Sequence, residues 1–119
     1  KIPHAPKIFN VNWFRTDEDG NFIWPGFGDN MRVLLWILAR CDDAVDAVET
    51  PVGYVPKPED INVDGLKDVT IDTIKELLKI DTESWKEDVK NIREFYALVG
   101  DRVPAELHAE LDALEKRLG

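Results

Sequence analysis

Two spacings of hydrophobic residues divide this chain, an alternating one near the N-terminus and a helical one after residue 30. Apolar side chains alternate with mostly polar ones over residues 7–14, which predicts a β-strand. Residues 16–21 are polar and contain an Asp-Gly turn signal, and residues 22–24 resume the alternation. The pattern therefore predicts an aromatic-rich β-hairpin that ends at the Pro-Gly pair of residues 25–26.

Helical spacing dominates the rest of the chain. Asp29 is predicted to cap a helix that begins near Asn30, and its apolar residues up to Cys41 predict burial on more than one side. Residues 50–56 contain two prolines and predict a short extended segment. Three closing helices, the second capped by Asp81, are predicted from three apolar faces: Ile71, Ile74, Leu77 and Leu78; Trp85, Val89, Ile92, Tyr96 and Val99; Leu107, Leu111, Leu114 and Leu118. The predicted class is α+β, an aromatic-rich β-hairpin followed by a mainly helical C-terminal part.

Composition and charge bound the function. The 119 residues are 44% hydrophobic and 33% charged, and no apolar run reaches the roughly 18 residues of a membrane helix. The net charge of −9 is uneven: residues 1–41 carry five basic and four acidic residues, whereas residues 42–119 carry 10 basic and 20 acidic ones. Because a phosphate backbone requires a basic surface, no nucleic-acid partner is expected, and no membrane either. The single cysteine, Cys41, fits a reducing cytoplasmic location, and its place on the apolar helix face predicts a buried, inert thiol.

Aromatic side chains are concentrated near the N-terminus. Six of the chain's 11 aromatics lie within residues 9–30, beside a Pro-Gly-x-Gly turn and an Asp-Asn helix start. Rings this dense can form a flat slot for a planar base, because every base presents a π-face for stacking. The alternative is that these rings pack the core of the hairpin, which is the commoner role of aromatics on strands. Spacing alone leaves both interpretations open.

Two strings in this region resemble the guanine-binding part of GTP-dependent phosphoenolpyruvate carboxykinase. They are Lys7-Ile8-Phe9-Asn10-Val11-Asn12-Trp13-Phe14-Arg15 and Phe22-Ile23-Trp24-Pro25-Gly26-Phe27-Gly28-Asp29-Asn30. The string Thr50-Pro51-Val52-Gly53-Tyr54-Val55-Pro56 and the chain from Glu76 onward also resemble this family, so the resemblance covers nearly the whole sequence. It implies that residues 1–119 are a C-terminal fragment of the carboxykinase nucleotide-binding domain. The aromatic hairpin and guanine slot would occupy residues 1–30, and residues 31–119 would be mostly helical. The start at Lys1 instead of Met predicts a fragment or a processed product.

The resemblance also implies an activity and a site. The family is a lyase that converts oxaloacetate and GTP to phosphoenolpyruvate, CO2 and GDP in gluconeogenesis, with divalent metal, usually Mn2+ and Mg2+. By position in the family motif, Phe14, Phe22 and Phe27 would line the guanine slot, and Asn30 would hydrogen-bond the base edge. The residues assigned to guanine nucleotide are Phe14, Phe22, Phe27, Gly28, Asp29 and Asn30.

Several of these residues also have a purely structural interpretation. Asn30 could be a polar residue in the first helical turn, and the cap interpretation of Asp29 is preferred over a base contact. Gly28 is expected to let the backbone approach the base closely. Trp13 and Trp24 are interpreted as core residues beneath the slot. By the same reasoning, Arg15 is expected to be a solvated charge, and neither His4 nor His108 receives a catalytic or metal-binding role.

The chain departs from the complete family in extent. It contains no Gly-x-x-x-x-Gly-Lys-Ser/Thr phosphate loop, and the resemblance places the metal ligands and the mobile lid outside it. We therefore expect the chain to have no catalytic residue or metal ligand of its own and to be inactive alone. Its expected partners are guanine nucleotide and the remainder of the parent enzyme, with self-association possible through faces that the parent would cover. The rival hypothesis is a non-catalytic protein-interaction module with an aromatic hairpin patch.

Overall fold

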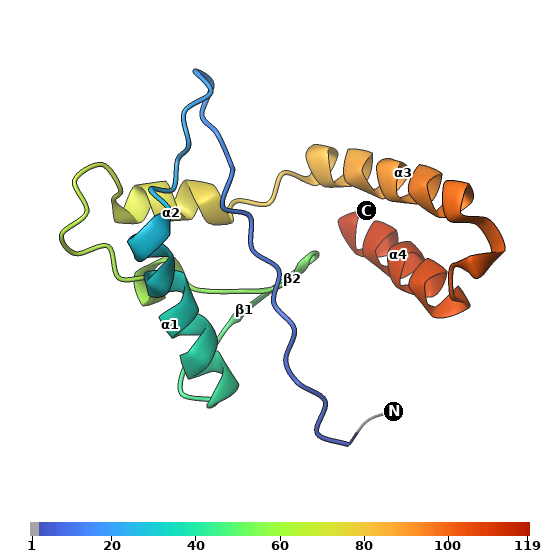
Figure 1. Cartoon of the computed structure of the whole chain (residues 1–119), viewed down its shortest axis with the longest axis horizontal. Helices are drawn as coiled ribbons and strands as arrows, with labels where there is room; N and C mark the ends of the chain where they lie inside the picture. The colour runs from blue at the N-terminus through green and yellow to red at the C-terminus, as the bar shows by residue number, and fades with distance from the viewer. Residues whose placement is uncertain (1–2) are drawn as a thin grey trace. The chain divides into compact units, whose positions relative to one another are not determined.

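The computed structural model describes residues 3–119, and it confirms an α+β chain (Figure 1). Regular structure consists of four α-helices, one two-stranded hairpin and three short 3-10 turns in the described residues. In chain order the elements are η1 Phe27–Asp29, α1 Asn30–Cys41, β1 Val48–Thr50, β2 Gly53–Val55, η2 Pro58–Asp60, α2 Ile71–Leu78, α3 Thr82–Val99, η3 Gly100–Arg102 and α4 Ala105–Leu118.

The chain forms two compact units. Unit 1 comprises Lys1–Val48 and Val55–Leu78, and unit 2 comprises Glu49–Tyr54 and Lys79–Gly119. Each unit has its own hydrophobic cluster. Within the described residues, no helix combines the length and the apolar composition that crossing a membrane requires.

The core of unit 1 is built around two tryptophans. Trp24 and Trp36 are each 6% exposed and lie in a cluster with Ile61, Val69 and Ile74. Trp13 is half-buried and packs against this cluster, so the interpretation of Trp13 and Trp24 as core residues is confirmed. These buried residues come from the aromatic segment, α1, the loop before α2 and α2 itself, which ties the irregular N-terminal region to the helices.

The predicted strand over residues 7–14 is absent. This segment has no regular backbone pairing, and its place on α1 comes from side chains. The Lys7 ammonium donates to the carbonyl oxygens of Arg40 at 2.6 Å and Cys41 at 3.3 Å, and to the Asp43 carboxylate at 2.6 Å. A cation at a helix C-terminus is favourable because the last carbonyls carry partial negative charge. The alternation of residues 7–14 thus arises because one side of this segment faces α1 and the core, although no partner strand is present.

The chain reversal after residue 15 was predicted correctly, but its pairing is minimal. Thr16 and Phe22 form a single antiparallel bridge. The Asp17 carboxylate accepts hydrogen bonds from the backbone N–H groups of Asp19 at 3.0 Å and Asn21 at 2.8 Å. Such local bonds compete with a ladder and close the turn by themselves. The β1–β2 hairpin instead forms where only a short extended segment was expected.

Helix α1 begins at Asn30 as predicted and ends at Cys41, but it is much less buried than expected. Only Trp36 is buried. Its outer face exposes Met31, Leu34, Leu35 and Leu38, with Leu35 and Leu38 59% and 58% exposed. The prediction of burial on more than one side is therefore wrong for this chain. Cys41 is also exposed, which contradicts the expectation of a buried thiol, because the helix end lies outside the core cluster.

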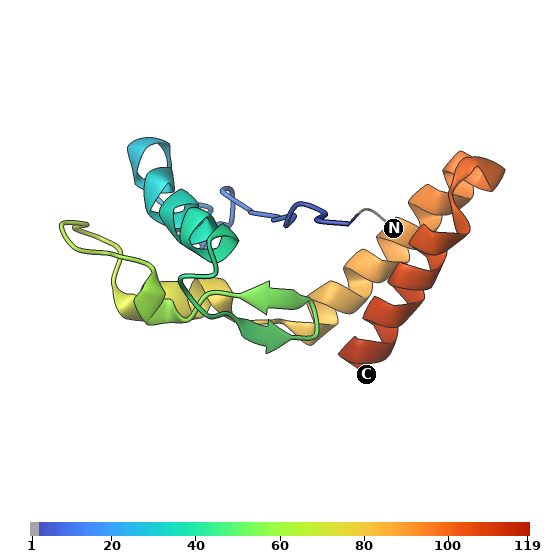
Figure 2. The same cartoon turned by 90° about the horizontal axis from the view of Figure 1, so that it is seen from below.

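Unit 2 is a helical hairpin with the tip of the β-hairpin beside it. Helices α3 and α4 run side by side in both views, and the arrows of β1 and β2 point in opposite directions (Figure 2). Val89, Leu111 and Leu118 form the buried cluster, and Val52 packs against it. Asp81 caps α3, because its side chain accepts from the N–H groups of Glu83 at 3.1 Å and Ser84 at 3.2 Å. The remaining apolar residues packed on the cluster are Trp85, Ile92, Tyr96 and Leu114.

Candidate functional site

Two of the predicted slot residues form an exposed aromatic pair. Phe14 and Phe22 are 72% and 63% exposed, and their ring centroids lie 5.9 Å apart at an interplanar angle of 62°. The Thr16–Phe22 bridge and the bond from the Ile23 N–H to the Arg15 carbonyl at 3.0 Å bring the two rings together. The alternative prediction that these two rings pack the core of the hairpin is therefore wrong, since both rings remain largely exposed to solvent.

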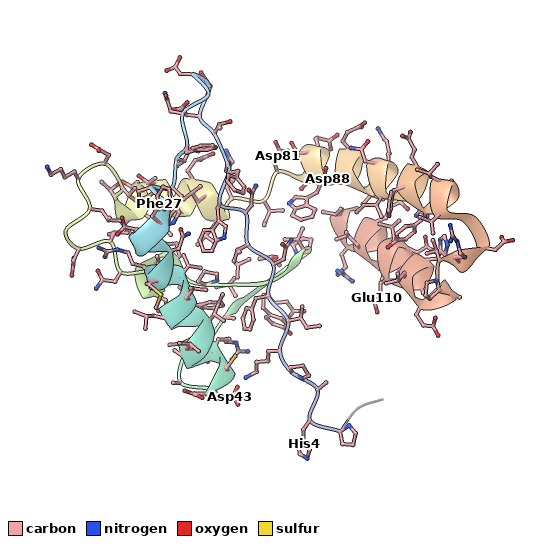
Figure 3. The ribbon with its side chains drawn as sticks, in the orientation of Figure 1. His4, Phe27, Asp43, Asp81, Asp88 and Glu110 are labelled. Carbon is pink, nitrogen blue, oxygen red and sulfur yellow. The ribbon has the colours of Figure 1, made fainter. Side chains whose placement is uncertain are left out.

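Phe27 is the most exposed aromatic of the predicted slot. Its side chain is 95% exposed, and its backbone has φ +46°, a conformation that residues with a Cβ rarely adopt. Figure 3 shows Phe27 at the turn that leads into α1. A strained backbone that presents a bare ring to solvent is a pattern found at ligand sites. Phe27 pairs with no other ring among the described residues, so Phe14 and Phe22 meet while Phe27 stands apart.

The glycines around Phe27 have different roles. Gly26 has φ +77° and ψ −164°, a conformation for which glycine is strongly favoured, and it sets the turn into η1. Gly28 has an ordinary φ, and a Cβ built there would meet no atom within 4 Å. Nothing in the described chain requires glycine at position 28. A close approach by a bound base stays the prediction that accounts for it.

Asn30 is held by a buried tryptophan. The Trp24 Nε1 donates a hydrogen bond to the Asn30 Oδ1 at 2.8 Å. Trp24 is buried, whereas Asn30 is half-buried at the first residue of α1. The amide oxygen is therefore engaged with the core, and the amide nitrogen is left to donate elsewhere. Sequence spacing did not reveal this bond. The only signal in the sequence was that a donor, Trp24, and an acceptor, Asn30, lie six residues apart on either side of a turn.

Asp29 occupies the predicted cap position but does not cap by its side chain. Its φ and ψ are −73° and −17°, because η1 runs directly into α1, and no side-chain cap bond forms. An N-cap residue needs non-helical dihedrals to reach the first N–H groups. The Asp29 carboxylate instead accepts from Arg32 Nε at 3.0 Å, and Arg32 Nη1 donates to the Asn62 carbonyl at 2.9 Å. This link anchors the start of α1 to the loop before α2.

Arg15 is committed to the fold and is not a solvated charge. Its Nη1 donates to the carbonyl oxygens of Glu76 at 2.8 Å and Leu77 at 3.0 Å, at the C-terminal end of α2, and its Nη2 lies 3.3 Å from the Glu76 carboxylate. The arginine thereby fixes the segment between Phe14 and the bridge against α2. In the neighbouring turn, hydrogen bonding led by the Asn21 backbone N–H lowers the pKa of Asp17.

No group of three or more His, Cys, Asp or Glu side chains within residues 3–119 is arranged to hold a metal ion. A separate open hollow of about 500 Å3 lies in unit 2, where α3, η3 and α4 meet. Arg93 lines it but is paired with Asp112 at 2.8 Å and with Glu115 on α4. The exposed aromatics and Asn30 of unit 1 are therefore the strongest candidate site.

Comparison with known proteins identifies the family of the chain. The family described as "Phosphoenolpyruvate carboxykinase C-terminal P-loop domain" matches residues 1–117. The chain is 51% identical over 119 residues to the phosphoenolpyruvate carboxykinase (GTP) of Treponema pallidum (strain Nichols), covering 99% of this chain and 19% of that protein. It is 50% identical over 113 residues to the phosphoenolpyruvate carboxykinase (GTP) of Corynebacterium glutamicum (strain R), covering 95% of this chain and 18% of that protein. The chain thus spans about a fifth of the length of these curated relatives. It belongs to the family of the phosphoenolpyruvate carboxykinase C-terminal P-loop domain.

Proposed function

We propose that this chain is the guanine-recognising, C-terminal part of a GTP-dependent phosphoenolpyruvate carboxykinase. Such an enzyme converts oxaloacetate and GTP to phosphoenolpyruvate, CO2 and GDP, as in gluconeogenesis. The observation that carries the proposal is the Asn30 amide, oriented by Trp24, on the same segment as three exposed phenylalanines. The names of the two relatives support the reaction. The exposed rings and the Asn30 amide support the base recognition.

Stacking on phenylalanine would provide much of the affinity for the base. Phe14, Phe22 and Phe27 are 72%, 63% and 95% exposed, so their faces are available to a ligand without unfolding the core. Stacking of a base on an aromatic ring contributes about 1–3 kcal/mol. Because adenine stacks as well as guanine, these rings bind a purine without choosing between them.

The choice of base would come from hydrogen bonding at Asn30. Its Nδ2 can donate to the guanine O6, and the second lone pair of its Oδ1 can accept from the guanine N1–H. Adenine carries an amino donor at position 6 and an acceptor at N1, so the same amide would leave groups unpaired. An unpaired buried polar group costs about 1–3 kcal/mol. Gly28 and Asp29 flank this contact, with Gly28 allowing close approach and Asp29 held by Arg32.

The chain contributes binding and specificity, and the remainder of the parent enzyme contributes the chemistry. No phosphate loop of the Gly-x-x-x-x-Gly-Lys-Ser/Thr type is present in the sequence. The Mn2+ and Mg2+ of the parent would be held by residues outside the chain. Held by its base, GTP would be positioned for transfer of its γ-phosphoryl group to the enolate of pyruvate. The nucleotide-binding domain of the parent would include residues 1–119, with the slot in residues 1–30 and the helical part in residues 31–119, in a cytoplasmic enzyme.

Two experiments test these statements. The purified chain should not turn over oxaloacetate in the presence of GTP and Mn2+, and metal-dependent turnover would contradict the assignment of the chemistry to other residues. In the full-length enzyme that carries this chain, kcat/KM should be higher for GTP and ITP than for ATP. Asn30→Ala should narrow that difference by about five- to 150-fold, the equivalent of 1–3 kcal/mol, and leave the KM for oxaloacetate unchanged. Equal use of ATP and GTP by the unmutated enzyme would overturn the proposal.

The exposure of the same rings also favours a second candidate, a non-catalytic protein-interaction module. Phe14, Phe22 and Phe27 are exposed on the same N-terminal segment, and aromatic side chains are enriched at interfaces. The two candidates differ in which added molecule should quench the tryptophan fluorescence of the chain or reduce the solvent exposure of the three phenylalanines. Guanine nucleotide should do so in the carboxykinase, whereas a module would respond to a protein partner and ignore GTP, ITP and ATP alike.

A further inference from the structure

We infer that Trp24 is a positioning residue for guanine selection, because its indole N–H fixes the Asn30 amide in the orientation that suits guanine. The inference rests on the proposed function, in which Asn30 contacts the base edge. It adds a buried residue of the hydrophobic core to the determinants of specificity.

The hydrogen bond between the two side chains is directional. Trp24 Nε1 lies 2.8 Å from Asn30 Oδ1. An indole nitrogen can only donate, so it pairs with the oxygen of the amide and never with its NH2 group. If the amide turned over, two donors would face each other and the indole N–H would lose its partner. The bond therefore leaves Nδ2 pointing away from Trp24, together with the remaining lone pair of Oδ1.

The orientation is rigid because both partners are anchored. The Trp24 ring is 6% exposed and packs with Trp36, Ile61 and Ile74 in the core of unit 1. Asn30 is the first residue of α1 and directly follows η1, so its backbone is held by two consecutive helical turns. The core thus fixes the donor, the donor fixes the amide oxygen, and the amide presents one hydrogen-bond pattern.

This rigidity is what makes the amide selective. An asparagine that rotates freely can offer its NH2 group to the guanine O6 or its oxygen to the adenine amino group, so it discriminates weakly. With Oδ1 engaged by Trp24, the NH2 group meets the atom at position 6 of the purine. Guanine and hypoxanthine have an acceptor there, whereas adenine has a donor. Sites that are built on fixed hydrogen bonds reject mismatched ligands more strongly than sites that are built on shape.

Unit 1 contains a matched control for this hydrogen bond. Trp36 lies in the same core cluster and is also 6% exposed, but its Nε1 is buried and has no hydrogen-bond partner in the part of the chain that the structure describes. Trp24→Phe and Trp36→Phe therefore remove the same atoms from the same core. Only Trp24→Phe removes a hydrogen bond to the base-recognising amide.

The test compares GTP, ITP and ATP in the full-length enzyme that carries this chain, unmutated and as Trp24→Phe, Trp36→Phe and Asn30→Ala. Trp24→Phe should raise the KM for GTP and ITP by about five-fold or more, which is the loss of one oriented hydrogen bond. It should not raise the KM for ATP, because a released amide can turn its oxygen toward the adenine amino group. The KM for oxaloacetate should stay within about two-fold, because the amide faces the base. Trp36→Phe should leave the ratio of GTP to ATP unchanged. Equal ratios in Trp24→Phe and Trp36→Phe would overturn the inference.

The same set separates this inference from the proposed function. If the unmutated enzyme shows no preference for GTP, or if Asn30→Ala keeps that preference, guanine recognition by Asn30 is wrong. If Asn30→Ala removes the preference and Trp24→Phe retains it, only the role of Trp24 is wrong.

A second measurement decides the question if Trp24→Phe does not fold. The unmutated enzyme and its Asn30→Ala variant are both labelled with 15N-tryptophan and compared. Asn30→Ala should shift the Trp24 indole resonance and speed the exchange of the indole N–H with solvent, because the acceptor of that N–H is lost. The Trp36 indole resonance should not move. An unchanged Trp24 signal would overturn the inference, since the hydrogen bond would not exist in solution.

Discussion

The two units of this chain differ in how much of their structure serves the fold. In unit 2, α3 and α4 pack along a buried line of Val89, Leu111 and Leu118, and a side chain caps the start of α3. In unit 1, the segment before α1 is irregular, three phenylalanines are exposed, and one of them sits in a strained backbone conformation. The helices of unit 2 are regular although Phe95 and Leu98 on α3 are exposed, whereas unit 1 departs from regular structure around the proposed guanine slot. Departures of this kind are expected at functional sites.

The departures in unit 1 have two different meanings. Phe27 combines strain with 95% exposure, which favours a ligand site. The outer face of α1, in contrast, is a regular apolar stripe of Met31, Leu35 and Leu38 in a relaxed helix. A stripe like this is typical of a face that packs on other protein. The comparison between the units can therefore be tested separately for stability, for ligand binding and for association.

The largest expected effect is on the stability of unit 2. Leu111→Ala should reduce the free energy of unfolding of this unit by about 2–5 kcal/mol, because it leaves a cavity at a side chain that is 4% exposed. Leu107→Ala in the same helix is the control, since Leu107 is 46% exposed and its loss should cost far less. Hydrogen exchange followed by mass spectrometry measures the effect in each unit. Equal loss of protection in unit 1 would show that the two units do not unfold separately.

The next effect is on nucleotide affinity. Phe27→Ala or Phe14→Ala in the full-length enzyme should raise the KM for GTP by about five- to 150-fold, because each removes a stacking surface. The KM for oxaloacetate should stay near its original value. Phe95→Ala provides a control from unit 2, since Phe95 is a 60% exposed phenylalanine on α3. A similar change in Phe95→Ala, or none in either slot variant, would show that the exposed rings of unit 1 are not the base-binding surface.

Sequence reasoning succeeded where a single physical rule decides the structure. The bounds of α1, α2 and α3 follow from apolar periodicity, and the Asp81 cap follows from the preference of aspartate for the position before a helix. It failed for residues 7–14, where Phe9 packs on Trp36 of α1 and Trp13 packs on the core cluster, and no strand formed. Periodicity reports which side of a segment is buried and says nothing about what covers it.

For the candidate site, the sequence indicated the residue types but not their partners. The density of aromatics and the family motif pointed to Phe14, Phe22, Phe27 and Asn30, and the structure leaves all three rings exposed. The hydrogen bond from Trp24 to Asn30 was missed, because it depends on the turn geometry at Gly26 and η1. The links of Arg15 to α2 were missed for a similar reason, since they connect positions 61 and 62 residues apart.

A smaller effect concerns the outer face of α1. We propose that the purified chain self-associates through this face, so Leu35→Lys with Leu38→Lys should weaken association by about ten-fold or more. The reason is that both leucines are more than half exposed on this face, so each lysine that replaces one would place a charge in the contact. Leu98→Lys on α3 is the control, because Leu98 is 82% exposed but lies in unit 2. Sedimentation over a concentration series measures the change. A monomer at every concentration before mutation would contradict the proposal.

The smallest expected effect is a pH dependence of local stability, which should be confined to a different turn in each unit. Hydrogen bonding led by the Ser84 backbone N–H holds the pKa of Asp81 below its usual range, because the ionised carboxylate is the form that caps α3. A lowered pKa in the folded state means that stabilisation is fully present above the unfolded value of about 3.9 and is lost as the pH falls through the folded value. Acidification below about pH 4 should therefore loosen the first turn of α3 before it disturbs the buried cluster of unit 2. Asp81→Asn keeps an oxygen that caps the helix but does not titrate, so it should weaken the turn slightly at neutral pH and remove this acid dependence. Amide exchange of Glu83 and Ser84 between pH 3 and pH 6 is the measurement, after correction for the intrinsic exchange rate.

Asp17→Asn is the parallel change in unit 1, where the pKa of Asp17 is also lowered, and it should alter exchange only in the turn before Phe22. If Asp17→Asn and Asp81→Asn each change exchange in both units, the two units share one cooperative transition and the comparison between them fails.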